Sequence, residues 1–256
     1  MNIAPSETVG VVIPTYNRAA VTLRAVNSVL NQTFPPTSVI VVDDGSDEAE
    51  LLKLEDSLKA LPVSLIKSVH KSNPALTRNI GLAKLETKWV AFLDSDDFWF
   101  ENKLETQLVL ALKSGSKAIC SNANRLSTQE KYLVKNKTCF FRLRDLLKSN
   151  QIINSSVLIE RKILAGIGGY VPSYNVRAVE DYATWLRIAT LTNWQYCKDP
   201  LITYDDTSVD GLSNISKIAQ IDTSIHALID FYIWKNRTKK NKRRLINFVL
   251  RIIAKL

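Results

Sequence analysis

Strand-like and helix-like segments alternate four times in the first half of this chain. Short apolar runs, several rich in β-branched residues, lie at 9–14, 38–42, 63–66 and 88–93, and a helical pattern follows each. This alternation predicts a doubly wound, mostly parallel α/β sheet with right-handed crossovers. With 256 residues, of which 46% are hydrophobic, the chain can bury the core of one large domain.

Polar clusters stand at the ends of three of the predicted strands. They are Pro14-Thr15-Tyr16-Asn17-Arg18, Asp43-Asp44-Gly45-Ser46 and Asp94-Ser95-Asp96-Asp97. Open α/β sheets bind their ligands outside the carboxyl ends of the strands. Because all three clusters belong to that edge, the sequence predicts a binding site there.

The apolar run 89–93 leads directly into three carboxylates, Asp94, Asp96 and Asp97. A buried strand does not tolerate such a cluster, and the carboxylates repel one another unless a cation joins them. Oxygen ligands favour Mg²⁺ or Mn²⁺ over zinc, and such an ion completes its shell with water and substrate phosphates. The cluster therefore indicates a metal–diphosphate site. The alternative is an acidic turn that only caps the helix expected near Glu101.

Other classes of site have no support in the sequence. The first strand lacks G-x-G-x-x-G, and G-x-x-x-x-G-K-[ST] is absent, which argues against a dinucleotide fingerprint and a P-loop. Cys120, Cys139 and Cys197 form no C-x-x-C pair, so we expect free thiols and neither a zinc site nor a disulfide framework. No signal peptide and no apolar run of spanning length is evident, so we expect a cytoplasmic protein.

The regular alternation ends near residue 121. We expect a hairpin or irregular excursion with a short helix over 124–150, a helix over 180–189, two short strands over 194–204 with a turn at Asp199-Pro200, and an amphipathic helix over 214–234. Glu180 and Asp181 begin the second of these helices, where carboxylates favour the helix dipole. Capping and a chemical role both remain open for this pair.

The motifs resemble those of family 2 inverting glycosyltransferases of the GT-A fold, over roughly residues 9–206. The matching segments are VVIPTYNR at 11–18, VDDGS at 42–46, TRNIG at 77–81, FLDSDD at 92–97, GGY at 168–170 and ED at 180–181. The resemblance implies a Rossmann-like sheet with a small acceptor-side excursion. The size of the chain and its basic tail are most similar to those of bacterial enzymes that build O-antigen or capsule repeat units.

The resemblance also implies a role for each cluster. Pro14, Tyr16 and Arg18 would line the nucleotide pocket, Asp44 would accept the uracil N3–H, and Arg78 would face the phosphates. Asp94-Ser95-Asp96 matches the DxD motif, in which Asp96 would bind Mn²⁺ or Mg²⁺ while Asp94 lies near the ribose or the metal and Ser95 near the nucleotide sugar. Asp181 would be the general base.

The chain departs from the family pattern after its last predicted strand. Many relatives have a histidine there that approaches the metal or the diphosphate, whereas this chain has Thr203-Tyr204-Asp205-Asp206-Thr207. Either Asp205 or Asp206 replaces that histidine as a metal ligand, or the position is structural. His70 and His226 match no motif, and no chemistry is assigned to them.

The basic surplus lies in one segment of the chain. Residues 235–256 hold nine of the 34 Lys and Arg residues and no acid, which leaves 25 basic residues against 25 acidic ones in 1–234. Apolar residues from Leu245 to Leu256 share one helical face, so we expect a basic amphipathic tail on an anionic membrane surface. The alternatives are a helix that packs on its own domain, and RNA binding. The lack of aromatic residues interleaved with the basic ones and the lack of a basic surplus in the rest of the chain argue against RNA binding.

These observations give one expected function and two alternatives. We expect domain 1–234 to transfer a hexose or N-acetylhexosamine from a UDP-sugar to a hydroxyl of a saccharide linked to polyprenyl diphosphate, on the inner face of the cytoplasmic membrane. No nucleic acid partner is expected. One alternative is a sugar-phosphate nucleotidyltransferase, but such enzymes require a glycine-rich, Arg/Lys-bearing loop after the first strand, which is absent here. The other is an inactive nucleotide-binding module that recruits partners to the membrane.

Overall fold

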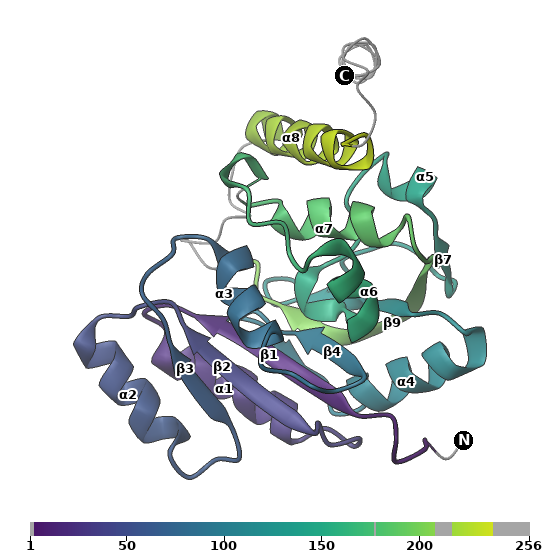
Figure 1. The fold of residues 1–256 in the computed structure, drawn as a ribbon. Helices are drawn as coiled ribbons and strands as arrows, with labels where there is room; N and C mark the ends of the chain where they lie inside the picture. The colour runs from purple at the N-terminus through teal and green to yellow at the C-terminus, as the bar shows by residue number, and fades with distance from the viewer. Residues whose placement is uncertain (1–2, 177, 208–216, 238–256) are drawn as a thin grey trace.

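A nine-stranded sheet crosses the part of the chain that the computed structural model describes, residues 3–176, 178–207 and 217–237 (Figure 1). The strands lie in the order β3-β2-β1-β4-β8-β6-β9-β5, and β7 also pairs with β9. Their bounds are Val9–Thr15 for β1, Ser38–Asp43 for β2, Ser64–Lys67 for β3, Trp89–Phe92 for β4, Phe98–Trp99 for β5, Ala118–Arg125 for β6, Cys139–Phe141 for β7, Leu158–Glu160 for β8 and Trp194–Tyr204 for β9.

The strand directions confirm the predicted mostly parallel sheet. β3, β2, β1 and β4 pair in parallel. β8 is antiparallel to both β4 and β6, so β6 runs in the direction of β4, and β9 is parallel to β6. Only the short strands β5, β7 and β8 oppose this direction within the described residues.

Helices cover both faces of the sheet, because successive residues of a buried strand point to opposite sides. Val12, Val42 and Phe92 pack with α3, α6, α7 and α8 in one apolar cluster. Val11, Val41 and Ala91 pack with α1, α2 and α4 in the other. The helices are Ala19–Leu30 for α1, Glu48–Leu58 for α2, Pro74–Leu82 for α3, Lys103–Ser114 for α4, Leu143–Leu146 for α5, Arg161–Ile167 for α6, Glu180–Ile188 for α7 and Lys217–Lys235 for α8, with 3₁₀ turns at Asn154–Ser156 and Tyr174–Val176.

The parallel register aligns the carboxyl ends of the strands. Thr15 lies opposite Asp43, and Asp43 lies opposite Lys67. On the other side of β1, Val12 lies opposite Phe92. The loops that follow β1, β2, β3 and β4 therefore leave the sheet at one edge, as the sequence predicts.

The segment 194–204 differs from its prediction. It forms one long strand, β9, and not two strands separated by a turn at Asp199-Pro200. Its pairing with β6 shifts between Ser121, which lies opposite Cys197, and Asn122, which lies opposite Pro200. A bulge at this point takes up the two extra residues and the missing N–H of the proline without ending the strand.

The α6 terminus docks on α3 through a glycine pair. Gly168 and Gly169 have φ values of +87° and +82°, which end α6 with a left-handed turn. Asn79 of α3 then accepts from the Tyr170 N–H at 2.8 Å and donates to the Tyr170 carbonyl at 3.0 Å. A Cβ at Gly169 would lie 2.6 Å from the Asn79 Oδ1 atom, so this close approach requires glycine.

α8 lies beside α7 at the top of Figure 1, where an ion pair of 2.7 Å joins Arg187 to Asp230. The described part of the chain contains no helix with the length and hydropathy of a membrane span. Residues 208–216 and 238–256 lie outside the described residues. The predicted amphipathic tail, the start of the helix predicted at 214 and the domain boundary after 234 therefore remain predictions.

The close packing of Gly169 against Asn79 gives a matched pair of stability predictions. Gly169→Ala should lower the free energy of unfolding by about 1–3 kcal/mol, because alanine at positive φ is strained and its Cβ meets Asn79. Gly166→Ala, inside α6 with only ordinary contact to Leu191, should raise it by about 0.5–1 kcal/mol. Urea denaturation of both variants measures the difference. Equal unfolding midpoints for the two variants would contradict the close contact between Gly169 and Asn79.

Candidate active site

A hydrogen-bonded turn at residues 43–47 ties the loop after β2 to the loop after β1. The Asp43 carboxylate accepts from the N–H groups of Gly45 and Ser46 at 3.1 and 3.0 Å and from the Ser46 hydroxyl. Asn17, at φ 51°, donates its N–H to the Ser46 Oγ at 2.7 Å. These contacts fix the backbone on both sides of Tyr16 and Asp44.

The Asp44 carboxylate lies almost buried at this edge. Its Oδ1 accepts from the Lys71 N–H at 3.0 Å, and its Oδ2 lies 3.2 Å from the Nδ1 of His70. The His70 ring stacks on Tyr16 with the ring centroids 4.3 Å apart. Pro14, two residues before Tyr16, lies opposite Val42 in the register and is partly buried.

Two arginines hold the carboxylate-rich turn 94–97. Arg18 donates from Nη1 to the Asp96 Oδ2 at 2.6 Å, and Arg24 donates to the Asp96 carbonyl. Burial and the charge of Asp94 raise the pKa of Asp96, and Arg18 opposes that rise. Ser95 is buried within the turn. The structure thus brings Arg18, Asp94 and Asp96 together, as the sequence predicts.

Asp97 connects this turn to the end of β9. It is buried, and its Oδ1 accepts the Asp205 N–H at 2.8 Å. Burial first, and then the charges of Asp94 and Asp96, raise the pKa of Asp97 well above its usual range. The Asp205 carboxylate lies 3.6 Å from Arg24, the same arginine that holds the Asp96 carbonyl.

Asp206 faces away from the turn 94–97 and binds Ser127 and Arg125. Its carboxylate accepts from the N–H and hydroxyl of Ser127 at 2.9 and 2.7 Å and pairs with Arg125 at 3.4 Å. Burial acts to raise the pKa of Asp206, but the bonds from Ser127 and Arg125 outweigh it and leave that pKa lowered. Of the two predicted replacements for the histidine, only Asp205 contacts residues that hold the turn 94–97.

Arg78 joins the turn 94–97 to α7. Its Nη2 donates to the Asp94 Oδ1 at 2.7 Å and its Nη1 donates to the Glu180 Oε1 at 2.8 Å. Its side chain is only 6% exposed, and its guanidinium lies 5.3 Å from the centre of the Tyr170 ring. Both terminal nitrogens of the residue expected to face phosphates thus bind carboxylates of the protein itself.

Asn154 completes the support of Asp94. Its Nδ2 donates to the Asp94 Oδ1 at 2.8 Å, and its own oxygen accepts from the Tyr170 hydroxyl at 2.6 Å. The Asp94 N–H donates to the Ser155 Oγ at 3.0 Å. The orientation of the Asp94 carboxylate is therefore fixed by Arg78 and Asn154 directly, and by Tyr170 through Asn154.

Asp181 follows Glu180 in the first turn of α7 and is half-buried. Burial first, and then the negative charge of Glu180, raise the pKa of Asp181 to about 7. The Tyr182 N–H donates to its Oδ1 at 2.5 Å. A carboxylate with such a pKa can accept a proton near neutral pH, which capping alone does not require.

The sequence-based predictions assign no role to three residues of this site: Arg24, His70 and Asn154. His70 had a usable signal, because it follows β3 at the same sheet edge as the three predicted clusters. Asn154 had a weaker one, a polar Asn-Ser-Ser run directly before an apolar strand. Arg24 lies in the middle of a helix with no motif, so only the fold identifies it.

Comparisons with known proteins identify the family of this chain. The sequence profile described as "Glycosyl transferase family 2" matches residues 10–158. An uncharacterized glycosyltransferase of Rickettsia bellii is 35% identical over 71% of this chain, which covers only 26% of that relative. The Escherichia coli UDP-Glc:alpha-D-GlcNAc-diphosphoundecaprenol beta-1,3-glucosyltransferase WfgD is 30% identical over 70% of this chain and 69% of its own length.

A solved structure has the same fold. S. aureus TarS in complex with UDP-GlcNAc superposes with a TM-score of 0.73 at 16% identity, covering 96% of this chain and 71% of that one. The structural likeness supports the fold alone, and the sequence profile supports the family.

The Glu180–Asp181 pair gives a prediction about protonation. Glu180→Gln keeps an oxygen that accepts from Arg78 but removes a charge that raises the pKa of Asp181. The pKa of Asp181 should therefore fall from about 7 toward its ordinary value. The carboxyl carbon shift of Asp181, followed by NMR against pH with Asp181→Asn used to assign the signal, measures the change, and an unshifted midpoint would remove Glu180 as a cause.

Proposed function

Since the chain belongs to glycosyl transferase family 2, we propose that it transfers a hexose or N-acetylhexosamine from a UDP-sugar to a saccharide hydroxyl, with inversion. One observation carries this proposal: Arg78 joins Asp94 of the candidate donor site to Glu180, the neighbour of the candidate base Asp181. The network fixes the donor motif at Asp94 relative to the proton acceptor Asp181. Such a fixed arrangement suits a single displacement between two bound substrates.

The relatives support a lipid-linked acceptor in bacterial surface polysaccharide synthesis. The name of WfgD specifies UDP-glucose and an acceptor on diphosphoundecaprenol, and the TarS complex holds UDP-GlcNAc. We propose an acceptor of the same class, a saccharide on polyprenyl diphosphate.

The nucleotide is expected to lie across the edge formed by the loops after β1, β2 and β3. Asp44 offers carboxylate oxygens near the exposed aromatic ring of Tyr16, since His70 contacts both residues. Arg18, which pairs with Asp96 and keeps 32% of its side chain accessible, is our candidate to contact the diphosphate. Arg78, being buried, positions Asp94 and Glu180 in this proposal.

The chemical step is one in-line displacement. The acceptor oxygen forms a bond to the anomeric carbon while the bond from that carbon to the UDP oxygen breaks, and UDP leaves with the electron pair. Asp181 takes the proton of the attacking hydroxyl. Because attack comes from the face opposite UDP, an α-linked donor gives a β-linked product.

The residues of the turn 94–97 fit a divalent cation. Asp94 and Asp96 offer oxygen ligands, and in the structure a guanidinium occupies the cationic position beside Asp96 at 2.6 Å. Asp205 is our candidate for a further ligand because of its link to Asp97 and Arg24. Bound Mn²⁺ or Mg²⁺ would stabilise the charge that develops on the diphosphate.

Two variants test the proposed function together. Asp96→Ala should abolish Mn²⁺-dependent binding of UDP and sugar transfer, because it removes the candidate metal ligand. Asp181→Asn should keep UDP binding and lower turnover by at least about a hundredfold, the scale of losing a positioned base. Calorimetry with UDP and Mn²⁺, paired with turnover of UDP-sugars, separates the two effects. Unchanged metal-dependent UDP binding in Asp96→Ala, or near wild-type turnover in Asp181→Asn, would contradict these roles.

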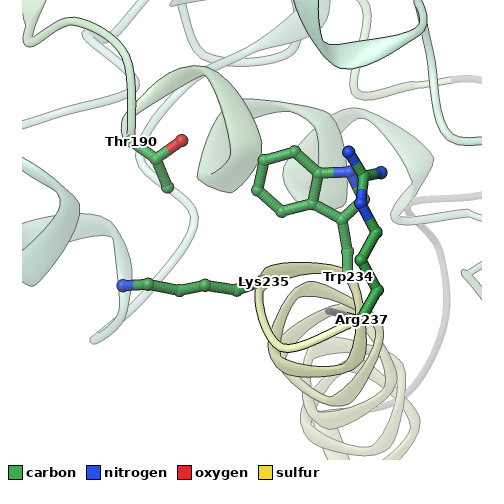
Figure 2. A pocket seen from close by; sticks show the side chains of 4 residues that line it. All are labelled: Thr190, Trp234, Lys235 and Arg237. Carbon is green, nitrogen blue, oxygen red and sulfur yellow. The ribbon is translucent and has the colours of Figure 1, made fainter. Parts of the chain in front are cut away.

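The membrane association of the tail is also a proposal, supported by the end of α8. Figure 2 shows a shallow hollow there, with the Arg237 side chain against the indole of Trp234 and Lys235 extending toward Thr190. The guanidiniums of Arg187 and Arg237 each lie 5.2 Å from the centre of the Trp234 ring. Tryptophan with basic neighbours is typical of a membrane–water interface, and the basic segment 239–244 follows directly.

Deletion of residues 239–256 should reduce co-sedimentation with anionic vesicles and slow transfer to a lipid-linked acceptor. Transfer to a short water-soluble acceptor should change little, because the described site lies within residues 14–205. Added salt should weaken vesicle binding of the full chain, since the attraction is partly Coulombic. A sharp fall in melting temperature with loss of both activities would instead place the tail in the domain core.

A further inference from the structure

The side chain of His70 faces Asp44 with one ring nitrogen. Its Nδ1 lies 2.8 Å from the Asp44 carbonyl oxygen and 3.2 Å from the Asp44 Oδ2. Both neighbours are acceptors, so this nitrogen carries a hydrogen and donates it. Nε2 lies 2.6 Å from the Ser72 hydroxyl, which can supply a hydrogen to it. The partners thus select the tautomer and fix the ring.

The loop that contains His70 packs directly on the Asp44–Gly45 turn. Gly45 has φ +80°, and a Cβ there would lie 2.6 Å from the backbone nitrogen of His70. The neighbouring N–H of Lys71 binds the other oxygen of Asp44 at 3.0 Å. The loop after β3 therefore holds Asp44 at two points, because the Lys71 N–H binds Oδ1 while His70 Nδ1 binds the backbone carbonyl and lies beside Oδ2.

The other partner of His70 is the ring of Tyr16. The two rings stack at 4.3 Å with planes 26° apart, too close to admit a third ring between them. Tyr16 is 42% exposed, which leaves ring surface open to a ligand beside the fixed carboxylate. A flat aromatic surface next to an oriented acceptor suits a planar base that carries a ring N–H.

We propose that His70 determines nucleobase choice at this site, an inference that rests on the proposed UDP-sugar donor. By holding Asp44, it presents a carboxylate oxygen that accepts the N3–H of uracil. Cytosine has a lone pair on N3, which a fixed carboxylate oxygen repels. Through its stack on Tyr16, His70 also holds the ring against which the base packs.

Two substitutions separate these contributions. His70→Asn retains a donor near the position of Nδ1 but removes the ring. His70→Phe retains the ring and removes the donor. His226→Asn and His226→Phe, at an exposed position on α8, are matched controls.

The experiment measures calorimetric affinity for UMP and CMP without divalent cation, so that the metal site does not contribute. Wild type should prefer UMP. His70→Phe should lose about tenfold in UMP affinity and most of the preference, the scale of a hydrogen bond to a charged group. His70→Asn should weaken both ligands by a similar factor and keep the preference. The His226 variants should match wild type.

The outcomes distinguish this inference from the proposed function. A wild-type preference for UMP in His70→Phe, with a melting temperature near wild type, would overturn the role of His70 while leaving the nucleotide site in place. If His70→Phe does not fold, His70→Leu, which also removes the donor, decides by the same UMP-to-CMP ratio. Absence of UMP binding by the wild-type protein would overturn the proposed donor and the role of His70 with it.

Discussion

The position of Arg78 is the constraint on which the rest of the site depends. Its buried guanidinium bridges Asp94, at the end of β4, and Glu180, at the start of α7, which are 86 residues apart in sequence. Removing one partner of a buried ion pair typically costs about 3–5 kcal/mol, because the other charge stays buried without compensation. The bridge therefore holds the turn 94–97 and α7 in one arrangement.

The parallel sheet supplies the second condition. Its register brings the ends of β1, β2, β3 and β4 to one edge, and backbone N–H groups join the loops after β1, β2 and β3. Asp43 binds the N–H groups of its own turn, and Lys71 gives its N–H to Asp44. Such contacts lose little conformational entropy, so the acceptor groups are oriented before any ligand arrives.

The turn 94–97 shows how the protein keeps carboxylates together. Asp94 is neutralised by Arg78, and Asp96 by Arg18, whereas buried Asp97 relieves repulsion through a raised pKa. The Arg18 pair is partly exposed and the Arg78 pair is not. The Arg18 pair therefore costs less to break than the buried Arg78 pair.

The sequence by itself determined the parallel sheet and the three polar strand ends, because local patterns record them, and its motifs predict roles for Asp94, Asp96 and Asp181. It did not determine the single strand β9, since a bulge opposite Ser121 overrides the turn signal of Asp199-Pro200. Only the tertiary structure decided that Arg78 is buried, that Asp205 and not Asp206 contacts the turn, and that His70 holds Asp44. The physical reason is that these roles depend on partners about 15 to 110 residues away, and a residue's chemistry in a fold follows from its neighbours in space.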